Sequence, residues 1–170
     1  MASRAKEFLF GMVAAALVTG GAATLMAQGM PTKIDDKPKA VAAAKERSTY
    51  MTMLAENEKH LVSVIKGQAP LDAKAVAAAE KIHTSTSPKE LLAHFAPGTG
   101  EGMVDGSRAR ATIWSEWDKF AQMAAAVQPA AAQALAAAKA GDQATFNEKE
   151  QATVNACSAC HKVYRAPRQR

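Results

Sequence analysis

The residues of this chain best suited to chemistry are two cysteines and a histidine close to its C-terminal end. Cys157-Ser158-Ala159-Cys160-His161 is a C-x-x-C-H box, the pattern of covalent c-type haem attachment. Residues three and four apart share one face of a helix, so both thiols could bond to the vinyl groups of a haem edge while His161 places an imidazole nitrogen on the iron. The box predicts one haem c, held through Cys157 and Cys160.

Three other uses of these cysteines fit the sequence less well. A thioredoxin-like redox pair needs a strand–helix–strand context, and no strand pattern surrounds the box. A zinc site needs two further ligands at suitable spacing, whereas His60, His83 and His94 are isolated and are expected at the surface or in loops. A disulfide across one helical turn would be strained.

Apolar periodicity places the box on the last of four expected helices. The first helix starts near Ala40, and Gly67 and Pro70 end it. The second starts at Asp72, whose carboxylate suits an N-cap, and ends before Pro88. One face of the first helix recurs in steps of three and four residues: Ala44, Arg47, Met51, Leu54, Glu58, Leu61 and Ile65.

The second half of the chain contains a long loop and two more helices. Residues 88–106 are rich in glycine and proline, so we expect a long covering loop with one helical turn near residues 91–95. The third helix should kink at Pro129, which removes a backbone hydrogen bond, and end at Gly141-Asp142. The last helix is expected over residues 143–164. The apolar face of the third consists of Ile113, Trp117, Phe120, Ala124, Val127, Ala131 and Leu135.

Composition limits the classes of fold and function. The chain has 170 residues, 48% of them hydrophobic but only 5% aromatic, which excludes both a disordered chain and an aromatic-rich β sandwich. Four amphipathic helices without a strand pattern predict an all-α antiparallel four-helix bundle. A net charge of +5 is too small and too dispersed for nucleic-acid binding. No catalytic constellation stands out, so an enzyme is not expected.

An export segment precedes the expected bundle. Arg4 and Lys6 form a short positive region, and residues 8–27 carry no charge, a pattern typical of a signal peptide that could be cleaved after Ala27. The uncharged stretch is also long enough for a retained membrane anchor. Either way we expect the rest in the periplasm, with residues 28–39 as a leader or tether and residues 40–170 as the haem-binding bundle.

Several stretches of the chain resemble the class II c-type cytochromes, the cytochrome c′ family. The resemblance covers residues 40–165. It rests on Arg47 with Met51, on Lys66-Gly67-Gln68-Ala69-Pro70, on Phe95-Ala96-Pro97-Gly98-Thr99, on Ile113-Trp114-Ser115, and on the run CSACHKVYR from Cys157 to Arg165. The family implies a left-handed bundle around one haem, with the box histidine as proximal ligand, and commonly a homodimer through the first two helices.

The resemblance also implies roles for residues outside the box. Arg47 matches the first-helix arginine that meets a haem propionate, and charge supports this role because a partly buried carboxylate needs a cation. Arg165 matches a basic residue beside the proximal histidine. Phe95 and Trp114 either line the haem pocket or belong to the ordinary core.

Met51 occupies the position that faces the iron across from His161. Within the family that position holds either a bulky uncoordinated residue, which leaves a five-coordinate iron, or a methionine that ligates it. Thioether ligation raises the iron potential and closes the gas site. Met51 is therefore either a sixth ligand or a steric gate, and its local context is closer to the five-coordinate branch.

These residues support three functional hypotheses. The leading one is an exported monohaem electron-transfer protein that meets redox partner proteins. The second is a protein that binds nitric oxide or carbon monoxide at a five-coordinate haem gated by Met51. The third is a helical bundle without haem that stores or senses metal.

Overall fold

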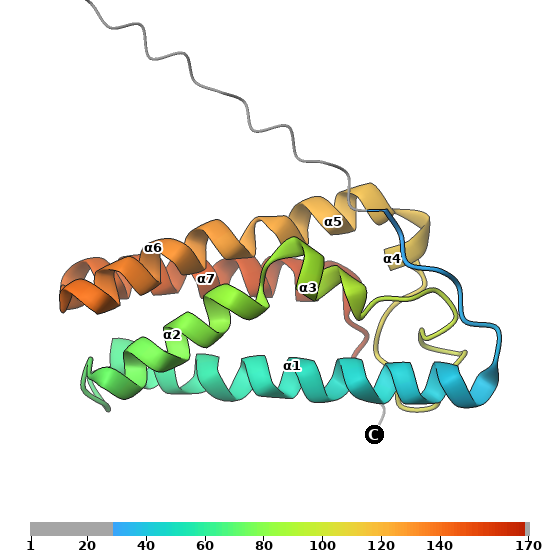
Figure 1. The fold of residues 1–170 in the computed structure, drawn as a ribbon, viewed down its shortest axis with the longest axis horizontal. Coiled ribbons are helices and arrows are strands. Elements are labelled where there is room, and N and C mark those ends of the chain that lie inside the picture. The colour runs from blue at the N-terminus through green and yellow to red at the C-terminus, as the bar shows by residue number, and fades with distance from the viewer. Residues whose placement is uncertain (1–28, 169–170) are drawn as a thin grey trace, which may run out of the picture.

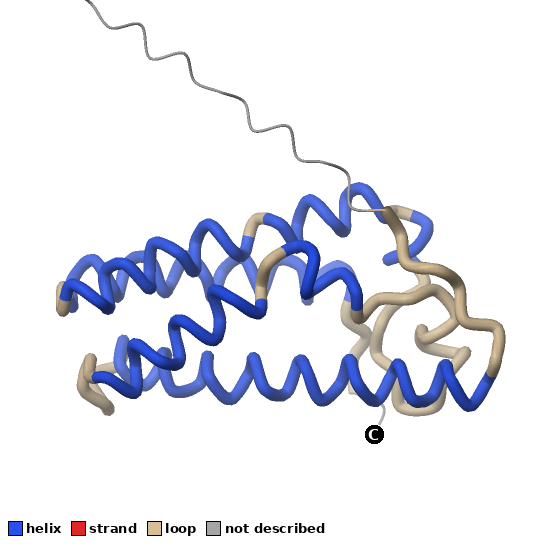
Figure 2. Tube along the Cα trace, viewed as in Figure 1, coloured by secondary structure: helices blue, strands red, loops and turns tan. Residues whose placement is uncertain are grey.

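The computed structural model describes residues 29–168, which form helices joined by turns and loops (Figure 2). No strand occurs within this range, and one isolated bridge pairs Ala109 with Arg165. None of the described helices is long and apolar enough to cross a membrane, and the predicted export segment, residues 1–27, lies outside the described residues. The helices are α1 (Lys37–Ile65), α2 (Ala73–Ser85), α3 (Pro88–Ala93), α4 (Thr112–Ser115), α5 (Trp117–Ala125), α6 (Val127–Ala140) and α7 (Gln143–Tyr164).

Two helical hairpins make the bundle. α1 and α2 form one antiparallel pair, and α6 and α7 form the other, with both tight turns at the same end (Figure 1). α2 packs on α6 and α1 packs on α7, so the four helices enclose one core. Much of that core is alanine, filled out by Leu61, Ile82 and Phe146. The predicted all-α antiparallel four-helix bundle is confirmed.

Aspartate caps fix where three of the helices begin. Oδ1 of Asp72 accepts hydrogen bonds from the backbone N–H groups of Lys74 and Ala75, at 2.9 and 3.0 Å, as the sequence predicted. Asp142 caps α7 in the same way. Each cap satisfies N–H groups that have no acceptor inside the helix. The last helix spans the predicted residues 143–164.

The first helix begins earlier than the predicted boundary at Ala40. Asp36 accepts from the N–H of Lys39 at 2.9 Å, and Pro38 lies in the first turn, where proline is favoured. Before the helix, the N–H of Ile34 donates to the carbonyl of Pro97 at 2.9 Å. This part of the predicted leader therefore packs on the long loop.

The third predicted helix is divided into α4, α5 and α6. The expected interruption by Pro129 is present, but it falls at Ala126. Pro129 becomes the third residue of α6, in the first turn, where its missing N–H removes no helical hydrogen bond. A second break at Glu116, with φ −121° and ψ 38°, was not predicted.

An aromatic cluster lies at the end of the bundle that the long loop covers. We use this name for Phe95, Trp117, Phe120 and Tyr164, all buried. Ring centroids of Phe120 lie 4.7 Å from Phe95, 5.7 Å from Trp117 and 5.2 Å from Tyr164. The cluster joins α5, the loop and the end of α7, and so fixes the surroundings of the C-x-x-C-H box.

Candidate haem site

The box lies on the last turns of α7, with its three functional side chains half-buried. Cys157, Cys160 and His161 have intermediate exposure, and both cysteines are free thiols. Thr153 and Tyr164, which are buried, have the helical spacing that puts them on the same inward face as the cysteines. The structure therefore brings the three predicted residues together, facing the bundle interior and not bulk solvent.

Burial keeps both thiols uncharged. It raises the pKa of Cys157 to about 12 and that of Cys160 to about 11. Thiolates are the reactive and metal-binding form of cysteine, so this environment disfavours a thiol redox pair. Neutral, half-buried, unpaired thiols are available for covalent attachment of an apolar group.

His161 is held in its neutral form. Burial, followed by the positive charges of Arg165 and Arg108, lowers the pKa of His161 to about 4. A neutral imidazole keeps a nitrogen lone pair for a metal ion. The exposed Arg165 follows α7 directly, and its backbone N–H donates to the carbonyl of His161 at 3.1 Å, which places it beside the histidine.

Arg47 is a buried cation at the same end of the bundle. Its side chain donates to Thr99 Oγ1 at 2.5 Å, to the Thr99 carbonyl at 2.7 Å, to Ser107 Oγ at 2.9 Å and to the His94 carbonyl at 3.4 Å. Its guanidinium carbon lies 5.4 Å from the centroid of the Phe95 ring. Burial lowers the pKa of Arg47 to about 10, so it stays charged. None of its acceptors in the described chain is a carboxylate.

Met51 from α1 and Cys160 from α7 pack against the same buried cluster. This larger group of buried side chains consists of the four residues of the aromatic cluster and five more, Leu91, Leu92, Ala109, Ile113 and Ala124. Met51 is partly buried there, as are Leu54 and Trp114. The first-helix methionine and the box thus border one apolar region, although they are far apart in the chain.

Phe95 and Trp114 take different parts in this region. Phe95 is 7% exposed and packs on Phe120 and under Arg47. The indole Nε1 of Trp114 donates to the carbonyl of Phe95 at 2.9 Å. Trp114 also lies over Gly100, where a Cβ would fall 2.5 Å from the indole ring. Both residues therefore pack next to the site.

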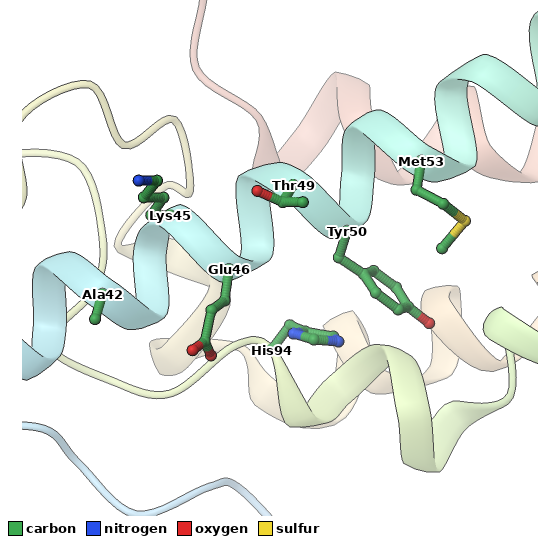
Figure 3. Close-up of a pocket in the computed structure, with 7 residues that line it drawn as sticks. All are labelled: Ala42, Lys45, Glu46, Thr49, Tyr50, Met53 and His94. Atoms are coloured by element: carbon green, nitrogen blue, oxygen red, sulfur yellow. The ribbon is translucent and has the colours of Figure 1, made fainter.

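The three isolated histidines lie apart from the box. Nε2 of His60 and Nδ1 of His83 are buried without a hydrogen-bond partner, so these two are less exposed than expected. His94 ends α3 and stacks on Tyr50, with ring centroids 4.0 Å apart. Figure 3 shows this stack beside Met53 in a shallow groove along α1, at the outer side of the bundle.

One pair of residues near the box was missed by the sequence reasoning. Glu58 on α1 and Glu150 on α7 interact inside the bundle. Together with burial, which is the larger cause, both raise the pKa of Cys157. A signal for Glu58 was present, because it falls on the apolar face of the first helix. Nothing local in the sequence indicates its partner.

The residues present fit a haem. The site offers two neutral thiols, one neutral imidazole, an apolar region and a buried cation without a carboxylate partner. A haem needs all of these, because it has two vinyl groups, an iron, an apolar macrocycle and two propionates. Cys157 and Cys160 would hold its edge, His161 its iron and Arg47 a propionate.

Comparison with known proteins agrees with this fit. The cytochrome c′ family model matches residues 42–165. The chain belongs to this family. Cytochrome c′ of Alcaligenes xylosoxydans xylosoxydans is 34% identical over 123 residues, which cover 72% of this chain and 92% of that relative.

Solved structures of the family have the same fold. A ferrous variant of cytochrome c′ from Alcaligenes xylosoxidans with bound nitric oxide superposes with a TM-score of 0.66 at 31% identity, over 80% of this chain and 100% of that one. A carbon monoxide-bound variant from the same source has a TM-score of 0.66 at 32% identity, over 79% and 100%. The chain is thus a c-type haem cytochrome, and its two cysteines, Cys157 and Cys160, carry one covalent haem c.

Proposed function

We propose that this cytochrome is an exported monohaem electron carrier with His161 as the axial ligand of its iron. The observation that carries the proposal is the position of the box: two neutral thiols and a neutral imidazole on the inward face at the end of α7, next to an apolar region. When bound, the haem would supply a one-electron Fe(III)/Fe(II) couple, with His161 holding its iron. The protein is a carrier or a binding protein and not an enzyme.

Each residue of the chain has a defined task in this proposal. Cys157 and Cys160 fix the haem so that it is not lost outside the cytoplasm. Burial, assisted by the positive charges of Arg165 and Arg108, keeps the imidazole of His161 unprotonated, because a further positive charge in an apolar place beside cations is unfavourable. Arg47 neutralises a propionate while Thr99 and Ser107 hold its guanidinium in place.

A second function, binding of nitric oxide or carbon monoxide, is supported by the solved relatives. Their structures include complexes with both gases. Met51 is partly buried against the apolar region next to Cys160, where an uncoordinated side chain would crowd an incoming gas. The two functions differ in the task of Met51, which is an iron ligand in the first case and a steric gate in the second.

We also propose a place of action and an assembly, on the basis of the N-terminal segment and the habits of the family. A signal in residues 1–27 would deliver the bundle to the periplasm, either free after cleavage or tethered through residues 8–27. There it would meet redox partner proteins. A homodimer through α1 and α2 is typical of the family, and size-exclusion chromatography with light scattering tests it directly.

The optical spectrum of the purified protein tests the proposed function. It is recorded oxidised, reduced, and reduced with carbon monoxide. Low-spin bands that carbon monoxide leaves unchanged support electron transfer with Met51 bound to iron. High-spin bands that shift with carbon monoxide favour gas binding. A spectrum with no Soret band would overturn both.

A further inference from the structure

Two glutamates are buried between the first and last helices without the partners that carboxylates normally have. Glu150 on α7 is 1% exposed, and Glu58 on α1 is half-buried. Both carboxyl oxygens of Glu58 and Oε1 of Glu150 are inaccessible to solvent and have no hydrogen-bond partner in the structure. Three orphaned carboxyl oxygens at one place need a physical explanation, because burying them unpaired is costly.

No cation compensates these carboxyls within residues 29–168. The ion pairs found there involve other acids. The titratable group that shifts the pKa of each carboxyl is the other glutamate, Glu58 from α1 and Glu150 from α7. Cys157 of α7 is the neighbouring thiol, and its own pKa is raised by burial and then by the two glutamates. α2 and α6 complete the core mainly with alanine and other apolar side chains and supply no charged group that acts on either carboxyl.

Two adjacent carboxyls in an apolar interior cannot both be ionised. Burial, and then the charge of Glu58, raise the pKa of Glu150 to about 9, and burial also raises the pKa of Glu58. A proton retained by one carboxyl can be donated to an oxygen of the other, so one proton satisfies atoms of both residues. The pair is therefore a place where this protein binds a proton near neutral pH.

The pair lies next to an attachment point of the haem. Glu150 precedes Cys157 by two helical turns on the same helix. Burial, and then the charges of Glu58 and Glu150, raise the pKa of the Cys157 thiol. A charge that changes the electrostatic potential at Cys157 also changes the potential at a haem bonded to Cys157, because the surroundings are apolar and screening by water is weak.

We propose that Glu58 and Glu150 form a proton-binding site whose occupancy is linked to the oxidation state of the haem iron. The inference rests on the proposed function, since it requires a redox-active haem on Cys157. An electron from a one-electron donor lowers by one the total charge of the haem and the glutamate pair taken together. A proton taken from bulk water by a carboxylate oxygen of the pair restores that charge, so one electron and one proton enter together. Oxidation by a one-electron acceptor releases the proton again.

The reduction potential of the holoprotein, measured against pH, tests this proposal. We expect the wild-type potential to fall as pH rises between about pH 5 and about pH 9. The equilibrium constant for reduction should change by up to tenfold per pH unit, which is about 59 mV for one electron. Glu150→Gln and the double variant with Glu58→Gln carry neutral mimics of the protonated acid, so most of this slope should disappear and the potential should stay near the low-pH value of the wild type.

Exposed glutamates on the same two helices provide matched controls. Glu148→Gln on α7 and Glu56→Gln on α1 make the same change of charge in solvent. These variants should keep the wild-type slope. A wild-type potential independent of pH, or a slope that survives in the double variant, would overturn the proposal.

Infrared spectroscopy gives a second readout that does not depend on the variants folding. The difference spectrum between oxidised and reduced wild-type protein should contain a protonated-carboxyl band, and its absence would contradict the proposal. Haem content is established first by mass and by the Soret band. A protein without haem would refute the proposed function, whereas a haem protein with no protonated-carboxyl band would refute the proton site alone.

Discussion

Arg47 on α1 donates two hydrogen bonds to Thr99 in the long loop, one to its hydroxyl and one to its carbonyl oxygen. Thr99 has no exposed surface, and Arg47 is 6% exposed. The pair therefore ties the first helix to the loop at the end of the bundle that holds the box. Since both acceptors are neutral, they do not offset the charge of the guanidinium, as the proposed contact of Arg47 with a propionate requires.

Replacing Arg47 by Ala should lower the free energy of unfolding by about 1–3 kcal/mol, because buried acceptors on Thr99 and Ser107 lose their donor. It should also shift the reduction potential. Urea unfolding and a redox titration measure the two effects. Lys45→Ala, at an exposed position on the same helix, should stay within about 0.5 kcal/mol of wild type. Equal stabilities and potentials for the two variants would place Arg47 outside the haem site.

Replacing Met51 by Ala separates the two functions proposed for the haem. If the thioether ligates iron, its loss should turn a low-spin ferrous spectrum high-spin and lower the potential. If Met51 is a gate, the wild type is already high-spin, and the variant should bind carbon monoxide faster. Met53→Ala, which alters the outer groove in Figure 3, is the control and should do neither. A Met51 variant unchanged in spin state and in carbon monoxide binding rate would show that Met51 does not face the iron.

The buried acid pair predicts that stability falls as the solution becomes more alkaline. The pKa of Glu150 is raised to about 9 in the folded protein, whereas an unfolded glutamate titrates near about 4.3. Between these values the folded state binds more protons than the unfolded state, so the free energy of unfolding decreases as pH rises, by up to about 1.4 kcal/mol per pH unit.

Urea unfolding at about pH 5.5 and about pH 8.5 checks this sign. Glu150→Gln should reduce the difference between the two conditions, because its amide does not titrate. Glu148→Gln should leave the difference unchanged, since that side chain lies in solvent. A wild-type protein that is more stable at the higher pH would contradict the assignment of a retained proton.

The contact of Ile34 with the long loop makes Gly98 a sensitive position. Gly98 has φ +91°, and a Cβ there would collide with the backbone carbonyl oxygen of Ile34. Gly98→Ala should therefore cost more than Gly102→Ala, where φ is +77° and the space is open. Strain from positive φ is common to both variants. The difference between their thermal unfolding therefore reports the contact between Gly98 and Ile34 alone. We expect Gly98→Ala to be the less stable by at least about 1 kcal/mol.

Features set by short-range rules could be predicted from the sequence. Capping by Asp72 and the bounds of α7 depend only on neighbouring residues, and so does the grouping of Cys157, Cys160 and His161 on one helical face. The interruption before Pro129 belongs to the same class, although its location at Ala126 follows from the preference of proline for a first turn.

Features that depend on which helices become neighbours could not be predicted in this way. Glu58 was assigned to the inward face of the first helix, but its pairing with Glu150 requires that α1 pack on α7. The hydrogen bonds from Arg47 to Thr99 join residues far apart in the chain, and so does the contact of Ile34 with Pro97. The break at Glu116 has no glycine or proline to signal it, and only the packed structure revealed it.

The most direct test of the central claim is the mass of the denatured protein, purified from the periplasm of cells that mature c-type cytochromes. The wild-type polypeptide should carry one haem that survives denaturation. The variant with Cys157→Ala and Cys160→Ala should have the mass of its polypeptide alone, because both thioether bonds are lost. A wild-type protein with the mass of the bare polypeptide would contradict the claim that Cys157 and Cys160 hold a haem.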